Sequence, residues 1–235
     1  MMRLLMFTPF LMVATMVLAP MLIRLGAISP LGGFGATMGA WIVGAGAGLL
    51  CGLIGVFKPD TRPLSWVALG LGVVLVGGLV MASSRASGPP IHDVTTDLVN
   101  PPTFTAAAAH PDNAGRDMTY PHGDPRTPDL QREHYPDLGN AVFCDTTREE
   151  VWRSVLDTAN DYNWSVTWTN AEAGLIEAEA TTAIFRFVDD IVIRLDQHNP
   201  PDGCYHIDIR STSRVGRSDF GANARRISDF LAGDD

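Results

Sequence analysis

Three long apolar runs without a charged side chain fill most of the first 84 residues and constrain the fold more than any other feature. They comprise residues 4–23, 25–57 and 63–84. A helix needs about 20 apolar residues to cross a bilayer core of about 30 Å. The runs therefore predict a three-helix transmembrane anchor over residues 1–85. The alternative is a cleaved signal peptide followed by a helical hairpin, but further apolar segments, and no clean cleavage site, follow the first run.

The positive charges that flank these runs predict the orientation of the anchor. They divide three to two across a three-span arrangement, with Arg3, Lys58 and Arg62 on one side and Arg24 and Arg85 on the other. Short cytoplasmic loops carry the excess of Lys and Arg, so we expect a cytoplasmic amino terminus. Three spans then place residues 86–235 outside the cytoplasm. In a bacterium this means an inner-membrane protein, surrounded by membrane lipids, with a periplasmic domain.

Charge limits the partners of the region beyond the anchor. Of the chain's 17 basic and 26 acidic residues, five basic and one acidic lie in residues 1–85. The other 12 basic and 25 acidic residues give residues 86–235 a formal net charge of −13. Such a surface repels nucleic acids and anionic lipids, which excludes nucleic acid as a partner. Cys144 and Cys204 could pair in an oxidising compartment, but the sequence leaves this disulfide open.

Residues 86–139 are rich in proline and show little periodicity, which is typical of extended, irregular chain. We expect a linker laid along the membrane surface, the folded domain or a partner, with a helical turn suggested at residues 106–109. Its four histidines are spaced by 18, 12 and 12 residues and match no local metal-ligand pattern. We therefore expect solvated histidines, no metal site and no cofactor.

Residues 140–235 predict a small α+β domain with the element order α-β-β-β-β-α. Thr146 and Glu149 have the spacing of a capping box and precede apolar residues at helical spacing. A final helix begins near Ser218 or Asp219. This order predicts an antiparallel four-stranded sheet with both helices packed on one face. The expected strands, separated by turn sequences, are residues 164–169, 175–182, 185–195 and 204–211.

Several segments of this domain resemble a known family. They include Gly-Leu-Ile-Glu-Ala at residues 174–178, Phe-Arg-Phe-Val-Asp-Asp at 185–190 and the long polar run at 208–227. Together they resemble the bacterial and plastid family catalogued as domain of unknown function 1499, over about residues 140–232. Residues 89–97 are similar to the lead-in of its membrane-anchored members. The resemblance implies a membrane-attached domain outside the cytoplasm and implies no reaction.

The polar run after the last strand allows two interpretations. Backbone N–H groups, a helix amino terminus and guanidinium groups together could bind a carboxylate, a phosphate or a lipid headgroup. The residues of this candidate anion loop are Arg210, Ser211, Ser213, Arg214, Gly216, Ser218 and Asn223. The alternative, which we prefer, is an internal ion-pair network in which the protein's own carboxylates neutralise the arginines. Its expected members are Glu177, Asp189, Asp190, Arg194 and Asp208, with Asp219 capping its own helix.

No motif in the sequence indicates catalysis. Four carboxylates could form an acid/base pair or metal ligands: Glu177, Glu179, Asp189 and Asp190. Glu177 and Glu179 share a strand face, about 7 Å apart. Cross-strand ion pairs on a solvated face are the more ordinary use of such residues. The sequence contains no nucleophile elbow, H-E-x-x-H, Cys-x-x-Cys or phosphate loop.

Glycine is the distinctive residue of the apolar runs, whose interiors hold none of the charged residues that ion and substrate paths usually need. Gly44, Gly48 and Gly52 recur at four-residue steps, and Gly35 and Gly39 form a further pair. Small residues at this spacing let helix backbones approach closely. One interpretation is that they only pack the three helices together. The alternative is that some of them contact another membrane protein, because a stripe of three glycines plus a further pair is more than one internal contact requires.

Two classes of function follow from these observations. The first is a non-enzymatic accessory or scaffold protein that holds an acidic periplasmic domain at the membrane, beside a larger membrane complex. The second is a periplasmic anion-binding, lipid-headgroup-binding or catalytic domain that uses the loop of residues 210–223. A closed ion-pair network favours the first class, and an open pocket beside the loop favours the second.

Overall fold

The computed structural model describes residues 2–85, 88–121, 124–196 and 203–233. The chain forms two compact units. One comprises Met1–Ser87 with Ala183–Arg186, and the other comprises Gly88–Thr182 with Phe187–Asp235.

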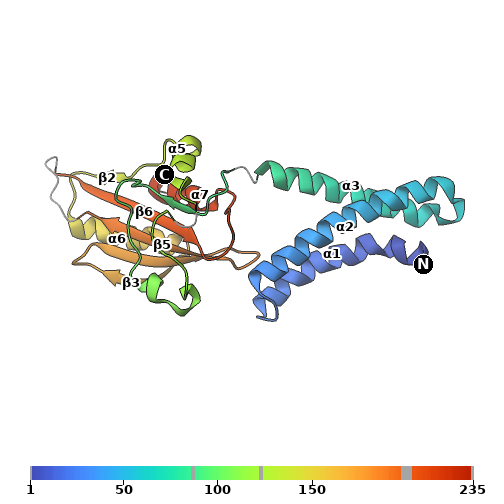
Figure 1. The fold of residues 1–235 in the computed structure, drawn as a ribbon, viewed down its shortest axis with the longest axis horizontal. Coiled ribbons are helices and arrows are strands. Elements are labelled where there is room, and N and C mark those ends of the chain that lie inside the picture. The colour runs from blue at the N-terminus through green and yellow to red at the C-terminus, as the bar shows by residue number, and fades with distance from the viewer. Residues whose placement is uncertain (1, 86–87, 122–123, 197–202, 234–235) are drawn as a thin grey trace. The chain divides into compact units, whose positions relative to one another are not determined.

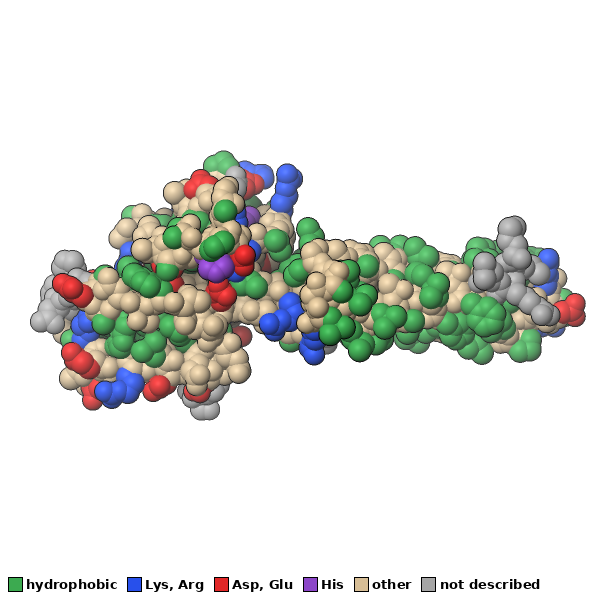
Figure 2. Space-filling view, turned by 90° about the horizontal axis from the view of Figure 1, so that it is seen from below, with side chains coloured by type: hydrophobic (Ala, Val, Ile, Leu, Met, Phe, Trp, Pro, Cys, Tyr) green, Lys and Arg blue, Asp and Glu red, His purple; other side chains and the backbone are tan. Residues whose placement is uncertain are grey.

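The first unit contains three long helices, α1 (Met2–Arg24), α2 (Pro30–Phe57) and α3 (Arg62–Arg85), with a short turn η1 (Pro59–Thr61) before α3. Their spans are long and apolar enough to cross a membrane, with mean hydropathies of 2.0 to 2.2. Ser29 caps α2 by accepting a hydrogen bond from the Gly32 N–H, 3.1 Å away. Hydrophobic side chains dominate the surface of the helices in Figure 2. The prediction of three apolar membrane helices is confirmed.

The second unit is built on one antiparallel sheet of six strands (Figure 1). The strand order across the sheet is β1-β6-β5-β4-β3. Strand β2 also pairs with β6, at residues 205–207, whereas β1 pairs with residues 210–212 of β6. The strands are β1 (Asp93–Thr95), β2 (Ala141–Phe143), β3 (Ser165–Asn170), β4 (Leu175–Thr181), β5 (Val188–Leu195) and β6 (Tyr205–Ser213). The predicted four-stranded sheet is therefore wrong in its strand number. Strands β1 and β2 were not predicted, because three residues are too few to show an alternating pattern.

One face of the sheet forms the main hydrophobic core against two helices, α6 (Arg148–Asp161) and α7 (Ala222–Ala232). Helix α6 begins with a capping box between Thr147 and Glu150, one residue later than expected. Both helices contribute side chains to the same core as the strands. Its members include Val151 and Val155 of α6, Ile227 and Phe230 of α7, and Ile176, Ile191, Ile193, Ile207 and Ile209 of the sheet.

The opposite face of the sheet is covered by the irregular chain between β1 and β2. Side chains alternate along a strand, so this face carries the residues of β4, β5 and β6 that do not enter the main core. Phe104 and Ala107 pack there on Val192 in a second small core. We call this chain between β1 and β2 the covering segment, and it includes α4 (Ala106–Ala109) and η2 (Pro111–Asn113). The chain expected as an extended linker thus lies, from residue 88 onward, in the same compact unit as the sheet.

Two contacts fix the edge of the sheet beside β6. Helix α5 (Thr127–His134) presents Gln131, whose side-chain amide donates to the Thr95 carbonyl at 2.6 Å and accepts from the Thr95 N–H at 3.1 Å. This satisfies the outer edge of β1, which would otherwise leave buried backbone groups unpaired. A disulfide joins Cys144, directly after β2, to Cys204, directly before β6.

Candidate functional site

Arg210 and Asp93 form a fully buried, two-bonded ion pair on the covered face of the sheet. Nε and Nη2 of Arg210 donate to the two carboxylate oxygens of Asp93, each at 2.9 Å. The exposed fractions of the two side chains are 1% and 0%. The guanidinium carbon lies 5.0 Å from the ring centre of Phe104 and 5.4 Å from that of Tyr120. Charge, hydrogen bonds and ring faces of this protein therefore satisfy Arg210.

Arg214, directly after β6, is bound by three carboxylates. Its Nη2 donates to Asp190 at 2.7 Å and also to Glu179, and its Nη1 donates to Asp112 at 3.2 Å. Burial by itself would lower the pKa of Arg214, but its hydrogen bonds to the Asp190 and Glu179 carboxylates raise the pKa above the ordinary value. Arg116 reaches the same Asp190 carboxylate from the covering segment, at 3.2 Å. The Asp190 side chain is wholly buried, so carboxylates of the protein itself neutralise the charge of Arg214 in this cluster.

Two further carboxylates, those of Asp208 and Asp97, bind Arg194. Its Nη2 donates to Asp208 at 2.7 Å and to Asp97 at 3.0 Å, and its Nη1 donates to the Asn100 carbonyl. The interaction joins β5 and β6 to the chain that follows β1. Arg194 and Asp208 were both expected in the ion-pair network, and the structure brings them together with Asp97.

On the helix-bearing face, Asp189 pairs with an arginine of α7. Nη2 of Arg226 donates to the Asp189 carboxylate at 2.6 Å, and its Nη1 donates to the hydroxyl of Ser211 at 3.1 Å. The Ser211 hydroxyl donates to Asn223 at 2.6 Å, and the Asn223 amide donates to the Ser213 hydroxyl at 3.1 Å. Three residues of the candidate anion loop therefore bond to one another.

The loop between β6 and α7 is closed by its own side chains. Asp219 accepts from the backbone N–H groups of Gly221, the N-cap residue of α7, at 2.9 Å and of Asn223 at 2.7 Å. It therefore binds the start of its own helix from two residues before the cap. Burial raises its pKa. Gly216 has a φ of 95°, a left-handed conformation that favours glycine. The Ser218 hydroxyl donates to the Pro89 carbonyl at 3.4 Å and accepts from the Phe220 N–H at 3.2 Å.

Glu177 has a different partner from the arginine that we expected. Its carboxylate is wholly buried and accepts from the backbone N–H groups of Thr105, Ala106 and Ala107, at 3.1 Å for Ala106 and 2.6 Å for Ala107. It binds the start of the short helix α4 and so holds the covering segment on the sheet. Glu177 and Glu179 are not a pair on a solvated face, because the covering segment lies over them.

Sequence reasoning missed the partners that come from far along the chain. They are Asp93 for Arg210, Arg116 and Asn113 for Asp190, and Arg226 for Asp189. Asp93 lies within residues 89–97, the segment that resembles the lead-in of the family's membrane-anchored members. This resemblance was the one sequence feature that could have pointed to Asp93. Among the residues that the structure describes, no group of three His, Cys, Asp or Glu side chains is arranged to hold a metal ion.

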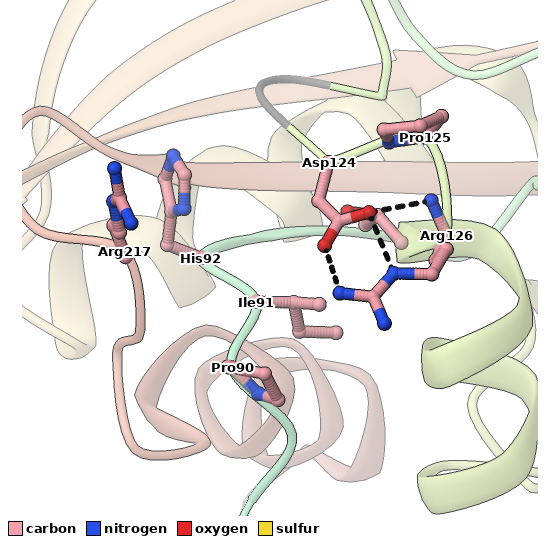
Figure 3. A pocket seen from close by; sticks show the side chains of 8 residues that line it. Pro90, Ile91, His92, Asp124, Pro125, Arg126 and Arg217 are labelled. Carbon is pink, nitrogen blue, oxygen red and sulfur yellow. Dashed lines mark hydrogen bonds and ion pairs between the residues drawn. The ribbon is translucent and has the colours of Figure 1, made fainter.

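A cavity of about 600 Å³ lies beside the loop (Figure 3). Its lining includes Pro90, Ile91 and Pro125, which are apolar, and Arg217 from the β6–α7 loop. Figure 3 shows Arg217 and His92 on one side and the Asp124–Arg126 ion pair on the other. Hydrogen bonds from Arg126 lower the pKa of Asp124 to about 2. Arg217 is exposed, and no carboxylate pairs with it in the described part of the chain.

The glycines of α2 divide into two groups. A Cβ on Gly48 would lie 2.6 Å from the Cα of Gly72 in α3, and one on Gly52 would lie 2.7 Å from a methyl carbon of Leu69. A Cβ on Gly44 would lie 3.0 Å from side-chain atoms of both α1 and α3. These three glycines therefore pack inside the three-helix unit. Gly35, Gly39 and Gly46 have open space where a Cβ would stand.

Comparison with known proteins agrees with the resemblance described above. No curated protein and no solved structure matches the chain. The matched family region begins at residue 93, the first residue of β1, so it includes the covering segment as well as the sheet. A family model described as "Protein of unknown function (DUF1499)" matches residues 93–233, more than half of the chain, and the chain therefore belongs to this family.

Proposed function

We propose that this protein is a non-enzymatic membrane-anchored accessory protein that holds an acidic periplasmic domain beside a larger membrane complex. The observation that carries the proposal is the neutralisation of the candidate anion loop. Arg210 and Arg214 are each bound by carboxylates of the same chain, and Asp219 occupies the N–H groups at the start of α7. A loop saturated in this way is suited to holding its own fold together.

The periplasmic placement rests on two independent features. The flanking charges favour a cytoplasmic amino terminus, so that three spans carry the domain across the membrane. The Cys144–Cys204 disulfide is the kind of bond that persists in oxidising compartments such as the periplasm. Both features support an inner-membrane protein with an external domain.

Substitution of Arg214 tests the structural role of the loop. Arg214→Ala leaves the buried Asp190 with a reduced counter-charge, which costs on the order of 3–5 kcal/mol. We expect a markedly lower melting temperature of the full chain in mild detergent. Arg132→Ala is the matched control, because its pair with Asp129 is exposed and such pairs contribute about 0–1 kcal/mol. An Arg214→Ala chain that keeps the wild-type melting temperature but loses a stabilisation by phosphate would reject the structural role.

Co-purification tests the accessory role itself. The full chain, isolated from membranes in mild detergent, should bring down a membrane protein in constant proportion, identified by mass spectrometry. Gly39→Leu adds a side chain where the unit leaves open space, and Gly48→Leu adds one where α3 lies against α2. A partner bound at the open glycines would be lost in Gly39→Leu without loss of stability. Isolation of the wild-type chain alone under these conditions would argue against the proposal.

The cavity beside Arg217 favours a second candidate, binding of a small anion with an apolar part. Arg217 has no carboxylate partner among the described residues, and Pro90 and Ile91 offer an apolar wall. Inorganic phosphate is a suitable first probe, and glycerol-3-phosphate is the second. Ligand-dependent stabilisation that Arg217→Ala abolishes and Arg153→Ala retains would favour this function. Arg153 is an exposed arginine of α6 and serves as the control.

A further inference from the structure

The two edges of the sheet end in different ways. On one side, β6 pairs with β1 and β2, and the Gln131 side chain bonds to the outer backbone of β1. On the other side the sheet ends at β3 (Figure 1), and within the described part of the chain no other segment bonds to the outer backbone groups of this strand. An edge of this kind is a template for pairing with a further strand.

The sequence of β3 lacks the residues that usually prevent such pairing. Proteins protect an exposed edge with lysine or other charged side chains, with proline, or with a covering helix or loop. Strand β3 is Ser-Val-Thr-Trp-Thr-Asn and contains neither a charged residue nor a proline, although residues 86–235 carry a formal net charge of −13. Four of its six residues are β-branched or aromatic, types that favour paired strands.

A bulge in β3 favours a second copy of this chain over a strand of another protein. The register of β3 on β4 shifts between Val166 and Trp168, and a bulge bends a strand and increases its twist. A regular strand would not follow this curvature along its length. A second β3 in antiparallel orientation has the same twist at the equivalent position, and such a pair has the two-fold symmetry of most dimers.

The symmetric register keeps the side chains of both strands on matching faces. A two-fold axis through the middle of β3 places Val166 opposite the partner's Thr169. In the ladder with β4, Val166 pairs with Ala178 and Thr169 pairs with Ile176. Ala178 and Ile176 both lie in the main core, so Val166 and Thr169 lie on the helix-bearing face. Directly opposed residues of an antiparallel pair share a face, and this register meets that requirement.

The two ends of α6 supply opposite charges that this arrangement brings together. Arg148, the first residue of α6, donates from Nη2 to the Ala171 carbonyl at 2.7 Å, directly after β3. Asp161, the last residue of α6, is exposed and lies shortly before β3. Neither forms an ion pair within the described part of its own chain. Antiparallel pairing places the end of one β3 beside the start of the other, and so Arg148 of each copy near Asp161 of the partner subunit.

We propose that β3 is a dimerisation edge, at which the β3 strands of two copies of this chain pair antiparallel and join their two sheets into one. The partner is a second copy of the chain. Backbone hydrogen bonds supply the recognition, and Arg148 and Asp161 add an ion pair at each end. This inference does not rest on the accessory role, since a domain of any function could dimerise in this way.

Charge substitution at the opposed positions tests the dimer in the full chain. The double variant Val166→Lys with Thr169→Lys places lysines directly opposite each other, and like charges so placed destabilise a strand pair. The double variant Val166→Glu with Thr169→Glu does the same with carboxylates. Val142→Lys with Val99→Lys is the control, because these side chains are 50% and 95% exposed and lie outside β3. Each chain is produced with two different affinity tags, and one tag is used to recover the other in mild detergent.

Recovery of the second tag should fall several-fold for the lysine variant and for the glutamate variant, and should stay at the wild-type level for the control. Co-production of the lysine variant with the glutamate variant should restore it, because each lysine then opposes a carboxylate of the other copy. This restoration also shows that both variants fold. Wild-type tags that do not recover each other, a dimer that survives both double variants, or a loss that the mixed pair does not reverse would overturn the proposal.

Discussion

In the described part of the sheet domain, carboxylates from distant parts of the chain bind two arginines that follow one another on the same face of the sheet. Arg210 and its partner Asp93 are separated by 117 residues, and Arg214 and Asp112 by 102. A buried ion pair adds little net stability over apolar residues of the same size, but removal of one partner leaves an unpaired charge at a large cost. These pairs therefore act chiefly by favouring one placement of the covering segment on the sheet, because any other placement would leave a charge unpaired.

Arg210→Lys should destabilise the domain although the charge is kept. A lysine has one point charge in place of the planar fork that bonds both oxygens of Asp93 and lies against two aromatic rings. We expect a loss of about 1–3 kcal/mol, the cost of an unsatisfied buried group. The melting temperature of the full chain in detergent measures it. Arg153→Lys, at an exposed position of α6, should leave the melting temperature unchanged. Equal melting temperatures of the two variants would contradict a structural role of the Arg210–Asp93 pair.

Asp97 should make stability depend on pH in the acid range. Burial alone would raise its pKa, but hydrogen bonds from the Asn100 and Val99 N–H groups and from Arg194 lower it below the ordinary 3.8. A carboxyl group with a lowered folded-state pKa stabilises the fold above its unfolded pKa, and the contribution disappears as pH falls through the folded value. Asp97→Asn should therefore melt below the wild type at neutral pH, with a difference that narrows below about pH 4. A constant difference across the pH series would contradict this assignment.

At the scale of elements, the covering segment is held by backbone contacts as much as by ion pairs. The Glu177 carboxylate binds the N–H groups at the start of α4. Asn113 of η2 donates from one side-chain amide to the Ala107 carbonyl at 2.8 Å and to Asp190 at 3.0 Å. Because α4 has only four residues, these external partners and not helix propensity determine that it forms.

Glu177→Gln should loosen α4 from the sheet. The amide has a single acceptor oxygen, so at least one of the N–H groups of Thr105, Ala106 and Ala107 loses its partner, at about 1–3 kcal/mol. Hydrogen exchange of these amides should accelerate by about tenfold or more, which corresponds to 1.4 kcal/mol. Glu133→Gln on the exposed side of α5 is the control. Unchanged exchange at residues 105–107 would mean that Glu177 does not hold the segment.

The periodic spacing of apolar residues predicts the long helices and strands, but it does not predict elements that are too short to show a period. The three apolar helices, the longer strands β3 to β6 and both core helices carry enough periodic residues to be predicted. Strands β1 and β2 have three residues each, and their partner β6 lies far along the chain. The same limit applies to the site: Arg194 and Asp208 lie on neighbouring predicted strands, whereas Asp93 and Arg226 become partners only through the tertiary fold.

Gly48→Leu should disrupt the packing of α2 on α3. A Cβ at this position would stand 2.6 Å from both Gly72 Cα and the Ala68 carbonyl oxygen, so the backbones must separate. We expect earlier thermal unfolding of the membrane unit in detergent, followed by the helical signal of circular dichroism. Leu49→Ala, one position along at a side chain 45% exposed, should have a much smaller effect. Equal effects would remove the case for a glycine contact.

At the scale of the whole molecule, the two units impose different requirements on their surroundings. The helical unit contains three helices that are long and apolar enough to cross a membrane. Residues 86–235 carry a net charge of −13, and the domain has a disulfide between the ends of two strands and ion pairs that need a folded partner segment. The orientation of the helices in the membrane determines whether the domain lies in an oxidising or a reducing compartment, and so whether the Cys144–Cys204 disulfide can persist.

Reporter fusions test this orientation directly. A reporter active only in the periplasm should be active when fused after Asp235 and silent when inserted at Asp60, between α2 and α3. The flanking charges motivate the expectation, since Lys58 and Arg62 lie beside Asp60 and favour the cytoplasm. The disulfide supplies an independent measurement: a thiol reagent added to unreduced, denatured protein should modify Cys51 alone, and Cys144 and Cys204 should become reactive only after reduction. An active reporter at Asp60, with free thiols at Cys144 and Cys204, would place the domain in the cytoplasm and reverse the proposed topology.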